Sequence, residues 1–240
     1  MAVFVLVHSP LVGPLTWRLV ADELQHRGFE VVLPSLDDFE DSGTPYWQQH
    51  AASVAQALNS VLADRPLILV GHSGAGLLLP AIRQMTDRRV AAYLFVDAGV
   101  PIDGASRLDL RALESPEMAE QSRQALASGE RFPNWSDKDL AEVIPDTKLR
   151  QGMLAELRPR PLAFFEEPIP VFDGWPDAPC GYLLFTPTYA YEVFAARARR
   201  DGWAYREMEG GHFHMLVDPK AVADALIDLL YSGEFPESSL

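Results

Sequence analysis

The sequence predicts an α/β fold, in which a mostly parallel β-sheet is covered by helices on both faces. Three observations indicate it. Short apolar runs alternate with longer amphipathic segments along most of the chain, and this alternation is typical of parallel strands joined by crossover helices. A tight turn of small residues follows the apolar run at 67–70, and one long stretch, 101–179, interrupts the alternation.

Strands are expected where short runs are continuously apolar, because strands buried on both faces lack polar alternation. The expected strands are 2–7, 29–33, 67–70, 90–96, 181–185 and 204–208. Helices are expected where apolar residues recur at helical spacing, as at Leu15, Leu19 and Leu24, with Gly28 as a stop signal. The expected helices are 14–27, 46–63, 75–85, 191–201 and 220–231.

The stretch 101–179 is rich in proline, arginine and glutamate and contains helical pieces at 116–127 and 138–143. A structureless loop of this length is improbable in a compact protein. We therefore expect a helical cap inserted above the sheet, within a single domain of residues 1–240. A separate small domain is the alternative, but the stretch has few clustered apolar residues with which to form its own core.

The motif GHSGAG at residues 71–76 lies between an expected strand and an expected helix. This is the context of a nucleophile elbow, with Ala75 in place of the usual last glycine. Bulk at Gly71 or Ala75 would collide with neighbouring backbone in such a tight turn. We expect Ser73 to be a catalytic nucleophile and the Gly74 N–H to face a developing oxyanion; a glycine-rich turn without chemistry is the alternative.

A serine hydroxyl needs a base, and His212 is the candidate. It lies in a glycine-rich loop between the last expected strand and the last expected helix. The chain order of serine, acid and histidine is the one found with nucleophile elbows. His214 is the rival, interpreted as a packing residue, and His26 and His50 are interpreted as surface residues of helices.

The third catalytic residue should be a carboxylate that orients the imidazole. Asp97 follows the apolar run that ends at Val96, and a carboxylate at the tip of a buried strand needs a partner. After the strand at 181–185 the first acid is Glu192, which lies inside an expected helix. Asp97 is therefore the preferred acid, with Glu192 as the alternative and a turn-capping role as a further interpretation of Asp97.

Segments 7–17, 71–75 and 211–219 together resemble the α/β-hydrolase superfamily, in particular its small esterase and hydroxynitrile-lyase-like branch. The resemblance covers nearly the whole chain. Esterases of this branch usually carry their acid after the strand that corresponds to 181–185, where it is missing here. Some haloalkane dehalogenases of the superfamily place it at the end of the previous strand, where Asp97 stands, so the resemblance implies a relocated triad of Ser73, His212 and Asp97.

The segment that begins with His8 is similar to the family's His-Gly-x motif, whose third residue usually donates the second oxyanion N–H. Here that residue is Pro10, which has no N–H. We expect the Leu11 N–H to take its place, with the Ser9 hydroxyl or a water as alternatives, and we expect Ser9 and Pro10 to border the substrate. Hydroxynitrile lyases of this branch carry a lysine directly after the catalytic histidine, whereas this chain has Phe213.

The expected function is a serine hydrolase that acts on a carboxylic ester, lactone or thioester through an acyl-enzyme. Haloalkane dehalogenases and epoxide hydrolases resemble this fold but use an aspartate nucleophile. Ser73 therefore argues against their chemistry. Non-hydrolytic acyl transfer, cyclisation or lyase chemistry on the same fold, and a ligand-binding role, stay open. Cap aromatic residues are candidates for lining a substrate pocket, or for packing the cap onto the body: Trp135, Phe164, Phe165 and Trp175.

The net charge is −14 and no basic stripe is present, which argues against nucleic-acid binding. Cys180 is the single cysteine, so no disulfide can form within the chain. No apolar run reaches the length of a membrane span, and the apolar start at 2–7 lacks the basic region of a signal peptide. We expect a cytoplasmic protein with a small-molecule substrate, no membrane partner and no metal or organic cofactor; a homodimer is compatible with the sequence.

Overall fold

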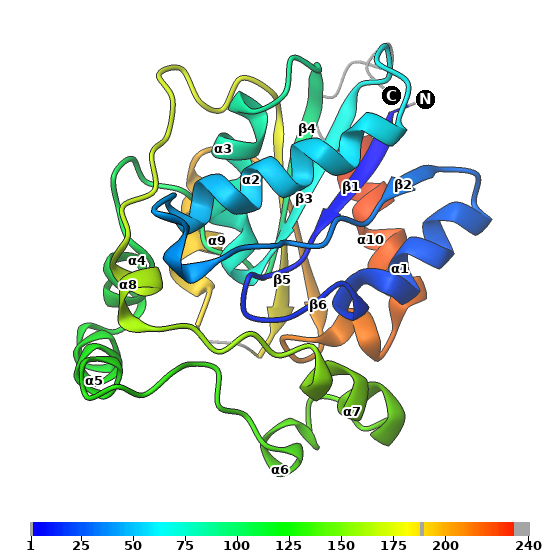
Figure 1. Ribbon diagram of the computed structural model, residues 1–240. Helices are drawn as coiled ribbons and strands as arrows, with labels where there is room; N and C mark the ends of the chain where they lie inside the picture. Colours follow the sequence, from blue (N-terminus) through cyan, green and yellow to red (C-terminus); the bar gives the residue numbers. More distant parts are fainter. Residues whose placement is uncertain (1, 188–189, 233–240) are drawn as a thin grey trace.

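The computed structural model describes residues 2–187 and 190–232. Six strands in this part of the chain form one sheet with the order β2-β1-β3-β4-β5-β6, and every neighbouring pair is parallel (Figure 1). The predicted parallel sheet is therefore confirmed. The strands are β1 (Val3–Val7), β2 (Glu30–Val32), β3 (Leu67–His72), β4 (Val90–Val96), β5 (Cys180–Thr186) and β6 (Ala204–Glu209).

Helices cover both faces of the sheet, as the sequence predicted. Successive side chains of a strand point to opposite faces, and β1 follows this rule: Val3, Val5 and Val7 belong to one apolar core, whereas Phe4 and Leu6 belong to the other. The first core includes α2 (Tyr46–Ala57), α3 (Leu79–Gln84) and α9 (Glu192–Arg200), and the second includes α1 (Leu15–His26) and α10 (Pro219–Ser232).

Two expected helices are shorter in the structure. The segment expected as a helix over 75–85 begins as a 3₁₀ turn over Ser73–Leu78 and becomes α-helical only in α3. Gly76 lets this turn pack closely against the loop after β4, because a Cβ on this residue would lie 2.3 Å from the carbonyl oxygen of Gly99. The segment expected over 46–63 ends its α-helix at Ala57 and continues as a 3₁₀ turn over Leu58–Ser60.

The segment between β4 and β5 carries five helices in the described chain and lies beside the carboxyl ends of the strands (Figure 1). Its apolar residues join the two cores of the body: Leu110 and Ile169 pack into the first, and Leu140 and Met153 into the second. The helices are α4 (Arg107–Glu114), α5 (Pro116–Ala127), α6 (Asp137–Leu140), α7 (Thr147–Ala155) and α8 (Leu162–Glu166). We call this segment, residues 101–179, the cap.

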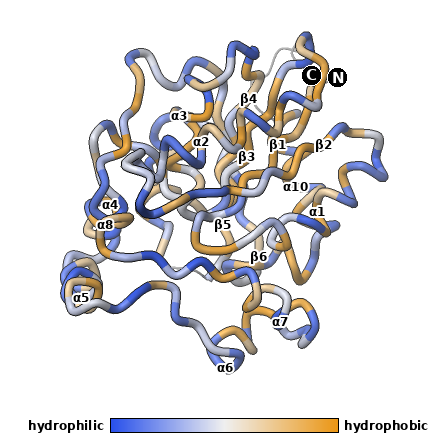
Figure 2. The backbone as a smooth tube through the Cα atoms, viewed as in Figure 1, coloured by the Kyte–Doolittle hydropathy of each residue, from blue (hydrophilic) through white to orange (hydrophobic). Residues whose placement is uncertain are grey.

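Apolar residues concentrate in the strands, whereas the cap contains long hydrophilic stretches (Figure 2). Within the described residues, no helix combines the length and the apolarity that crossing a membrane requires. The fold thus supplies an apolar sheet whose carboxyl edge faces a polar, helical cap, and ligands of open α/β sheets bind at this edge.

Candidate active site

Ser73 stands at the end of β3 in a backbone conformation that most residues avoid. Its φ is 57°, in the left-handed region, and its side chain is largely buried. The turn is tight because Gly71 and Gly76 pack against one another, and a Cβ on Gly71 would lie 3.0 Å from the nitrogen of Gly76. This strained strand-to-helix turn is the geometry of a nucleophile elbow.

His212 and Asp97 are joined by a short hydrogen bond. The distance from His212 Nδ1 to Asp97 Oδ2 is 2.6 Å, and Asp97 has no exposed surface. Asp97 directly follows β4 with a φ of 43°, and its Oδ1 accepts a hydrogen bond from the Phe185 N–H at 3.4 Å. The bond at Nδ1 fixes the tautomer of His212 and leaves Nε2 to act toward a nucleophile.

Two aromatic rings hold the imidazole of His212 in place. The ring of Tyr191 stacks on it with centroids 5.3 Å apart and an interplanar angle of 9°, and the ring of His72 lies 4.5 Å away. His72 Nε2 donates a hydrogen bond of 2.9 Å to the His212 carbonyl oxygen. Burial holds the pKa of His72 well below its usual value, so His72 is a neutral support for the loop.

Tyr191 also contacts the serine directly. Its hydroxyl lies 2.9 Å from Ser73 Oγ, and within the described residues no hydrogen bond joins Ser73 to His212. Burial raises the pKa of Tyr191, so its hydroxyl keeps its proton at neutral pH. From the sequence, Tyr191 was expected only as the first residue of a helix. The signal that could have identified it is its place soon after β5, at the carboxyl edge of the sheet where ligands bind.

The site opens into a cavity of about 430 Å³ between the body and the cap. The body contributes Ser73, Gly74, Asp97, Tyr191, His212 and the predicted oxyanion residue Leu11. The cap contributes apolar and polar side chains in equal number, and the apolar ones include Leu108, Leu126, Phe132, Trp135 and Phe165. Ser9 lies beside the elbow, with its Oγ 3.4 Å from the position that a Cβ on Gly74 would take, and Pro10 follows at 3.9 Å.

Three ionisable cap residues on α4 border the same cavity: Arg107, Arg111 and Glu114. Burial raises the pKa of Glu114 to about 7, against the opposing effect of Arg111. Glu114 therefore carries only part of a negative charge at neutral pH, and the cavity wall at α4 is not strongly acidic despite the acidity of the whole chain.

Phe164 does not line the cavity, so the expectation that it contacts substrate is not supported. Its ring is fully buried beneath the guanidinium of Arg107, whose Cζ lies 3.8 Å from the ring centroid, and it contacts Tyr46 edge-on. Phe164 thus packs the cap onto the body. Trp175 behaves in the same way, because it packs against Tyr93 and Phe95.

His50 is buried, so the prediction from the sequence that it is a surface residue is wrong. It has no exposed surface, and its Nε2 lies 2.8 Å from Asp38 Oδ2. His26 is exposed as expected, and His214 packs edge-on against Phe185. Glu192, the alternative acid, is an exposed residue of α9 that pairs with Arg199.

Among residues 2–187 and 190–232, no group of three or more histidine, cysteine or acidic side chains is arranged to hold a metal ion. The site brings together a serine hydroxyl, an imidazole, a buried carboxylate and backbone N–H groups, which are the components of acyl transfer through a covalent intermediate.

Comparison with known proteins gives three kinds of similarity. A family model described as "Alpha/beta hydrolase family" matches residues 4–225. The Arabidopsis thaliana protein named "Putative methylesterase 13, chloroplastic" is 24% identical over 174 residues, which are 67% of this chain and 39% of that protein. The chain thus spans about two fifths of the length of this curated relative.

Solved structures share the fold at low sequence identity. An extracellular alpha/beta-hydrolase from a Paenibacillus species, described as homologous to tobacco salicylic acid binding protein 2, superimposes with a TM-score of 0.75 at 22% identity over 95% of this chain and 99% of that chain. Tomato methylketone synthase I, in complex with beta-ketoheptanoate, gives a TM-score of 0.72 at 16% identity over 95% and 96% of the two chains.

Proposed function

The chain belongs to the alpha/beta hydrolase family, and from this membership and the residues around Ser73 we propose that it is a carboxylic-ester hydrolase with a serine nucleophile. Lactones and thioesters belong to the same proposed substrate class. The observation that carries the proposal is the 2.6 Å contact between His212 Nδ1 and Asp97 Oδ2, beside a strained serine that borders a cavity between the body and the cap.

Catalysis would begin with a rotation of Ser73 Oγ from Tyr191 toward His212 Nε2. His212 then accepts the hydroxyl proton while Oγ attacks the substrate carbonyl carbon, and Asp97 stabilises the imidazolium that forms. The carbonyl oxygen becomes an oxyanion that accepts hydrogen bonds from the N–H groups of Gly74 and Leu11. His212 returns the proton to the leaving oxygen or sulfur, which departs and leaves an acyl-enzyme.

Water completes the cycle by the same route. His212 takes one proton from a water molecule, the hydroxide oxygen bonds to the acyl carbon, and the bond to Ser73 Oγ breaks as the serine regains a proton. The products are a carboxylic acid and an alcohol or thiol. The aromatic and aliphatic residues of the cap wall, including Trp135 and Phe132, support a substrate with an apolar acyl or leaving group.

Phe213 weakens a lyase alternative. The residue after His212 is a buried phenylalanine that packs against the rings of His72 and Trp135, so it offers no cation to a cyanide leaving group. Pro10 is the residue that favours a different acyl chemistry, because it removes one N–H from the position where the family usually donates one.

The test is labelling with a fluorophosphonate probe, which reacts with activated serines. Wild-type protein should label, Ser73→Ala should not, and His212→Ala and Asp97→Asn should label at least 100-fold more slowly, as expected for parts of one triad. Folding of each variant is checked by circular dichroism. A folded wild type that fails to label would refute the serine-hydrolase proposal and leave a ligand-binding role as the better hypothesis.

Hydrolysis is distinguished from transfer or lyase chemistry by product analysis. Release of acid from 4-nitrophenyl acetate, at a rate that does not depend on added alcohols or amines, would support a hydrolase. Labelling at Ser73 without acid release would point to acyl transfer.

A further inference from the structure

We propose that Arg160 of the cap, together with Asp38, is a positioning residue that orients the Leu11 N–H as the second oxyanion donor. The inference rests on the proposed ester hydrolysis and deepens it, because it explains how the site compensates for Pro10. It also gives the cap a role in the chemistry beyond shaping the cavity.

Arg160 holds two groups at once. Its two terminal nitrogens donate to the two carboxylate oxygens of Asp38, each at 2.5 Å, and its Nε and Nη2 donate to the carbonyl oxygen of Pro10 at 3.3 and 3.2 Å. Both side chains are almost completely buried, with 7% and 4% exposed surface. The planar fork of arginine suits such bidentate contacts, whereas a lysine ammonium would not reproduce them.

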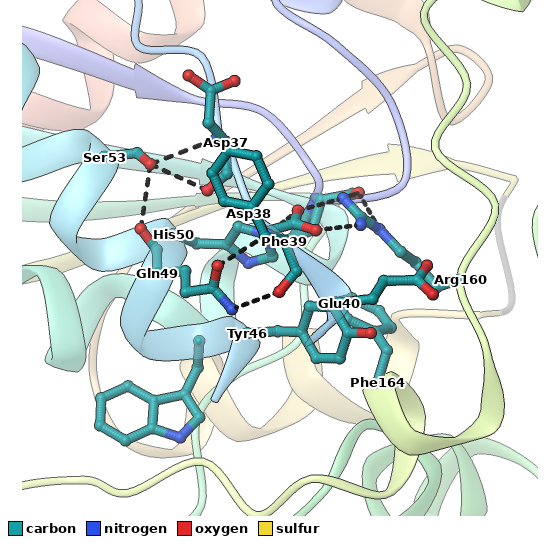
Figure 3. Close-up of polar contacts among 12 residues, drawn as sticks. Asp37, Asp38, Phe39, Glu40, Tyr46, Gln49, His50, Ser53, Arg160 and Phe164 are labelled. Atoms are coloured by element: carbon teal, nitrogen blue, oxygen red, sulfur yellow. Dashed lines mark hydrogen bonds and ion pairs between the residues drawn. The ribbon is translucent and has the colours of Figure 1, made fainter. Parts of the chain in front are cut away.

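Asp38 is itself fixed from a second side. His50 Nε2 lies 2.8 Å from Asp38 Oδ2, so the carboxylate lies between a histidine of α2 and the arginine of the cap, as Figure 3 shows. Burial alone would raise the pKa of Asp38, but the hydrogen bonds from His50 and Arg160 outweigh it and lower this pKa to about 2. The rings of Tyr46 and Phe164 flank the guanidinium at 5.8 and 5.6 Å.

The Pro10 carbonyl belongs to the same peptide unit as the Leu11 N–H. In a trans peptide these two groups point in opposite directions, so fixing the carbonyl toward Arg160 turns the N–H away from it. The backbone N–H of Arg158 also donates to the Leu11 carbonyl oxygen at 2.9 Å. Residues 158–160 of the cap therefore donate hydrogen bonds to the carbonyl oxygens of Pro10 and Leu11, which lie on either side of the Leu11 N–H.

The Leu11 N–H faces a weak acceptor in this structure. It points to Ser9 Oγ at 3.4 Å, which is long for a hydrogen bond to a hydroxyl. Leu11 lines the cavity together with Ser73 and Gly74. An oxyanion is a stronger acceptor than a serine hydroxyl, so the N–H can exchange this partner for the substrate without a change in the peptide plane.

The experiment compares Arg160→Met and Arg160→Lys with Arg150→Met as the matched control. Arg150 is also a buried cap arginine; it pairs with Asp137 and donates to the Ile144 carbonyl oxygen, but these contacts lie within the cap. The readouts are kcat and KM for 4-nitrophenyl acetate and the Ki of an aryl trifluoromethyl ketone, whose tetrahedral hemiketal adduct with a serine carries an oxyanion.

We expect kcat to fall about 10- to 100-fold in Arg160→Met, because a misoriented donor should cost no more than the complete removal of one oxyanion donor. KM should change less than about twofold. The Ki of the ketone should rise in parallel with the loss of kcat. Arg160→Lys should keep the charge opposite Asp38 and the fold, yet lose most of the same kcat. Arg150→Met should lower the melting temperature but leave kcat and Ki unchanged.

The inference is overturned if the folded Arg160→Lys variant keeps wild-type kcat and Ki, or if Arg150→Met loses as much kcat as the Arg160 variants, which would indicate general loosening of the cap. Should Arg160→Met fail to fold, the lysine variant decides. Fluorophosphonate labelling of wild type separates the two proposals: absent labelling refutes the hydrolase itself, whereas normal labelling with unaffected Arg160 variants refutes only the positioning role.

Discussion

Ser73 and Asp97 are the two non-glycine residues with positive φ among the described residues, and both lie at the candidate site. Such conformations cost about 1 to 3 kcal/mol and persist where the surroundings enforce them. Each follows a central strand, β3 or β4, so the sheet edge brings the hydroxyl and the carboxylate to the same side. Strain at two neighbouring strand ends is thus concentrated where the chemistry is proposed.

Tyr191 offers a test at a single atom. Replacing it by phenylalanine keeps the ring stacked on His212 and removes the hydroxyl that lies 2.9 Å from Ser73 Oγ. We expect kcat/KM for an aryl ester to rise up to about 5-fold, because Ser73 Oγ no longer has to break a hydrogen bond worth about 1 kcal/mol before it turns toward His212. Tyr205→Phe, on the edge strand β6, is the control; a fall in kcat/KM for Tyr191→Phe would instead show that the tyrosine hydroxyl assists the reaction.

At the N-terminus of helix α2, no side chain of the helix itself accepts a hydrogen bond from the first N–H groups. A residue of the inserted segment 101–179 supplies the missing acceptor. Glu167, which directly follows α8, accepts hydrogen bonds from the N–H groups of Tyr46 and Trp47 at 2.8 and 3.0 Å and pairs with buried Arg107 at 2.9 Å. A carboxylate at a helix N-terminus stabilises the unpaired N–H groups there. The cap is thereby bound to the body at the helix that also carries His50.

Removing this carboxylate should destabilise the fold. Glu167→Ala leaves Arg107 buried without its charge partner and α2 without its acceptor, so we expect the free energy of unfolding to fall by about 3 kcal/mol. Denaturant unfolding measures it. The neighbouring Glu166 pairs with Arg123 at the surface, and Glu166→Ala should change stability by less than about 0.5 kcal/mol; equal effects of both variants would contradict the proposed linkage.

Three histidines are buried and neutral beneath the site, and together they make the stability of the whole molecule sensitive to acid. Burial lowers the pKa of His8 to about 4 and also lowers those of His50 and His72. In the unfolded chain the pKa of each histidine would be about 6.5. Between these values the unfolded state binds protons that the folded state does not, so stability rises with pH.

The free energy of unfolding should therefore fall as the pH drops from about 6.5 toward about 4, with about 3 kcal/mol from His8 alone. Asp38, whose pKa is about 2 in the fold, adds a further loss below about pH 4. Urea unfolding from pH 7.5 to about pH 2.5 measures both losses. His8→Asn should flatten the slope and the exposed His26→Asn should not; a pH-independent stability would show that the histidines are not held neutral.

The family, the parallel sheet and the strand-end placement of Ser73 were predictable from the sequence, because continuous apolar runs and a small-residue turn are local patterns with local physical causes. The expected resemblance to the α/β-hydrolases is confirmed by the family match. Asp97 was predictable as a candidate because a carboxylate directly after a buried strand requires a partner. Its contact with His212, 115 residues away, required the fold.

The remaining features depend on packing between distant segments, which periodicity and motifs do not encode. The sequence around His50 does not show whether its side chain lies on the buried or the exposed face of the helix. In the structure His50 is buried and contacts Asp38, which in turn pairs with Arg160. Phe164 was indistinguishable from Trp135 as a cap aromatic residue, yet Trp135 faces the cavity while Phe164 lies beneath Arg107. Tyr191 and Arg160 carry no motif, and their contacts with Ser73 and Pro10 exist because the sheet edge and the cap bring together residues that lie 118 and 150 positions apart.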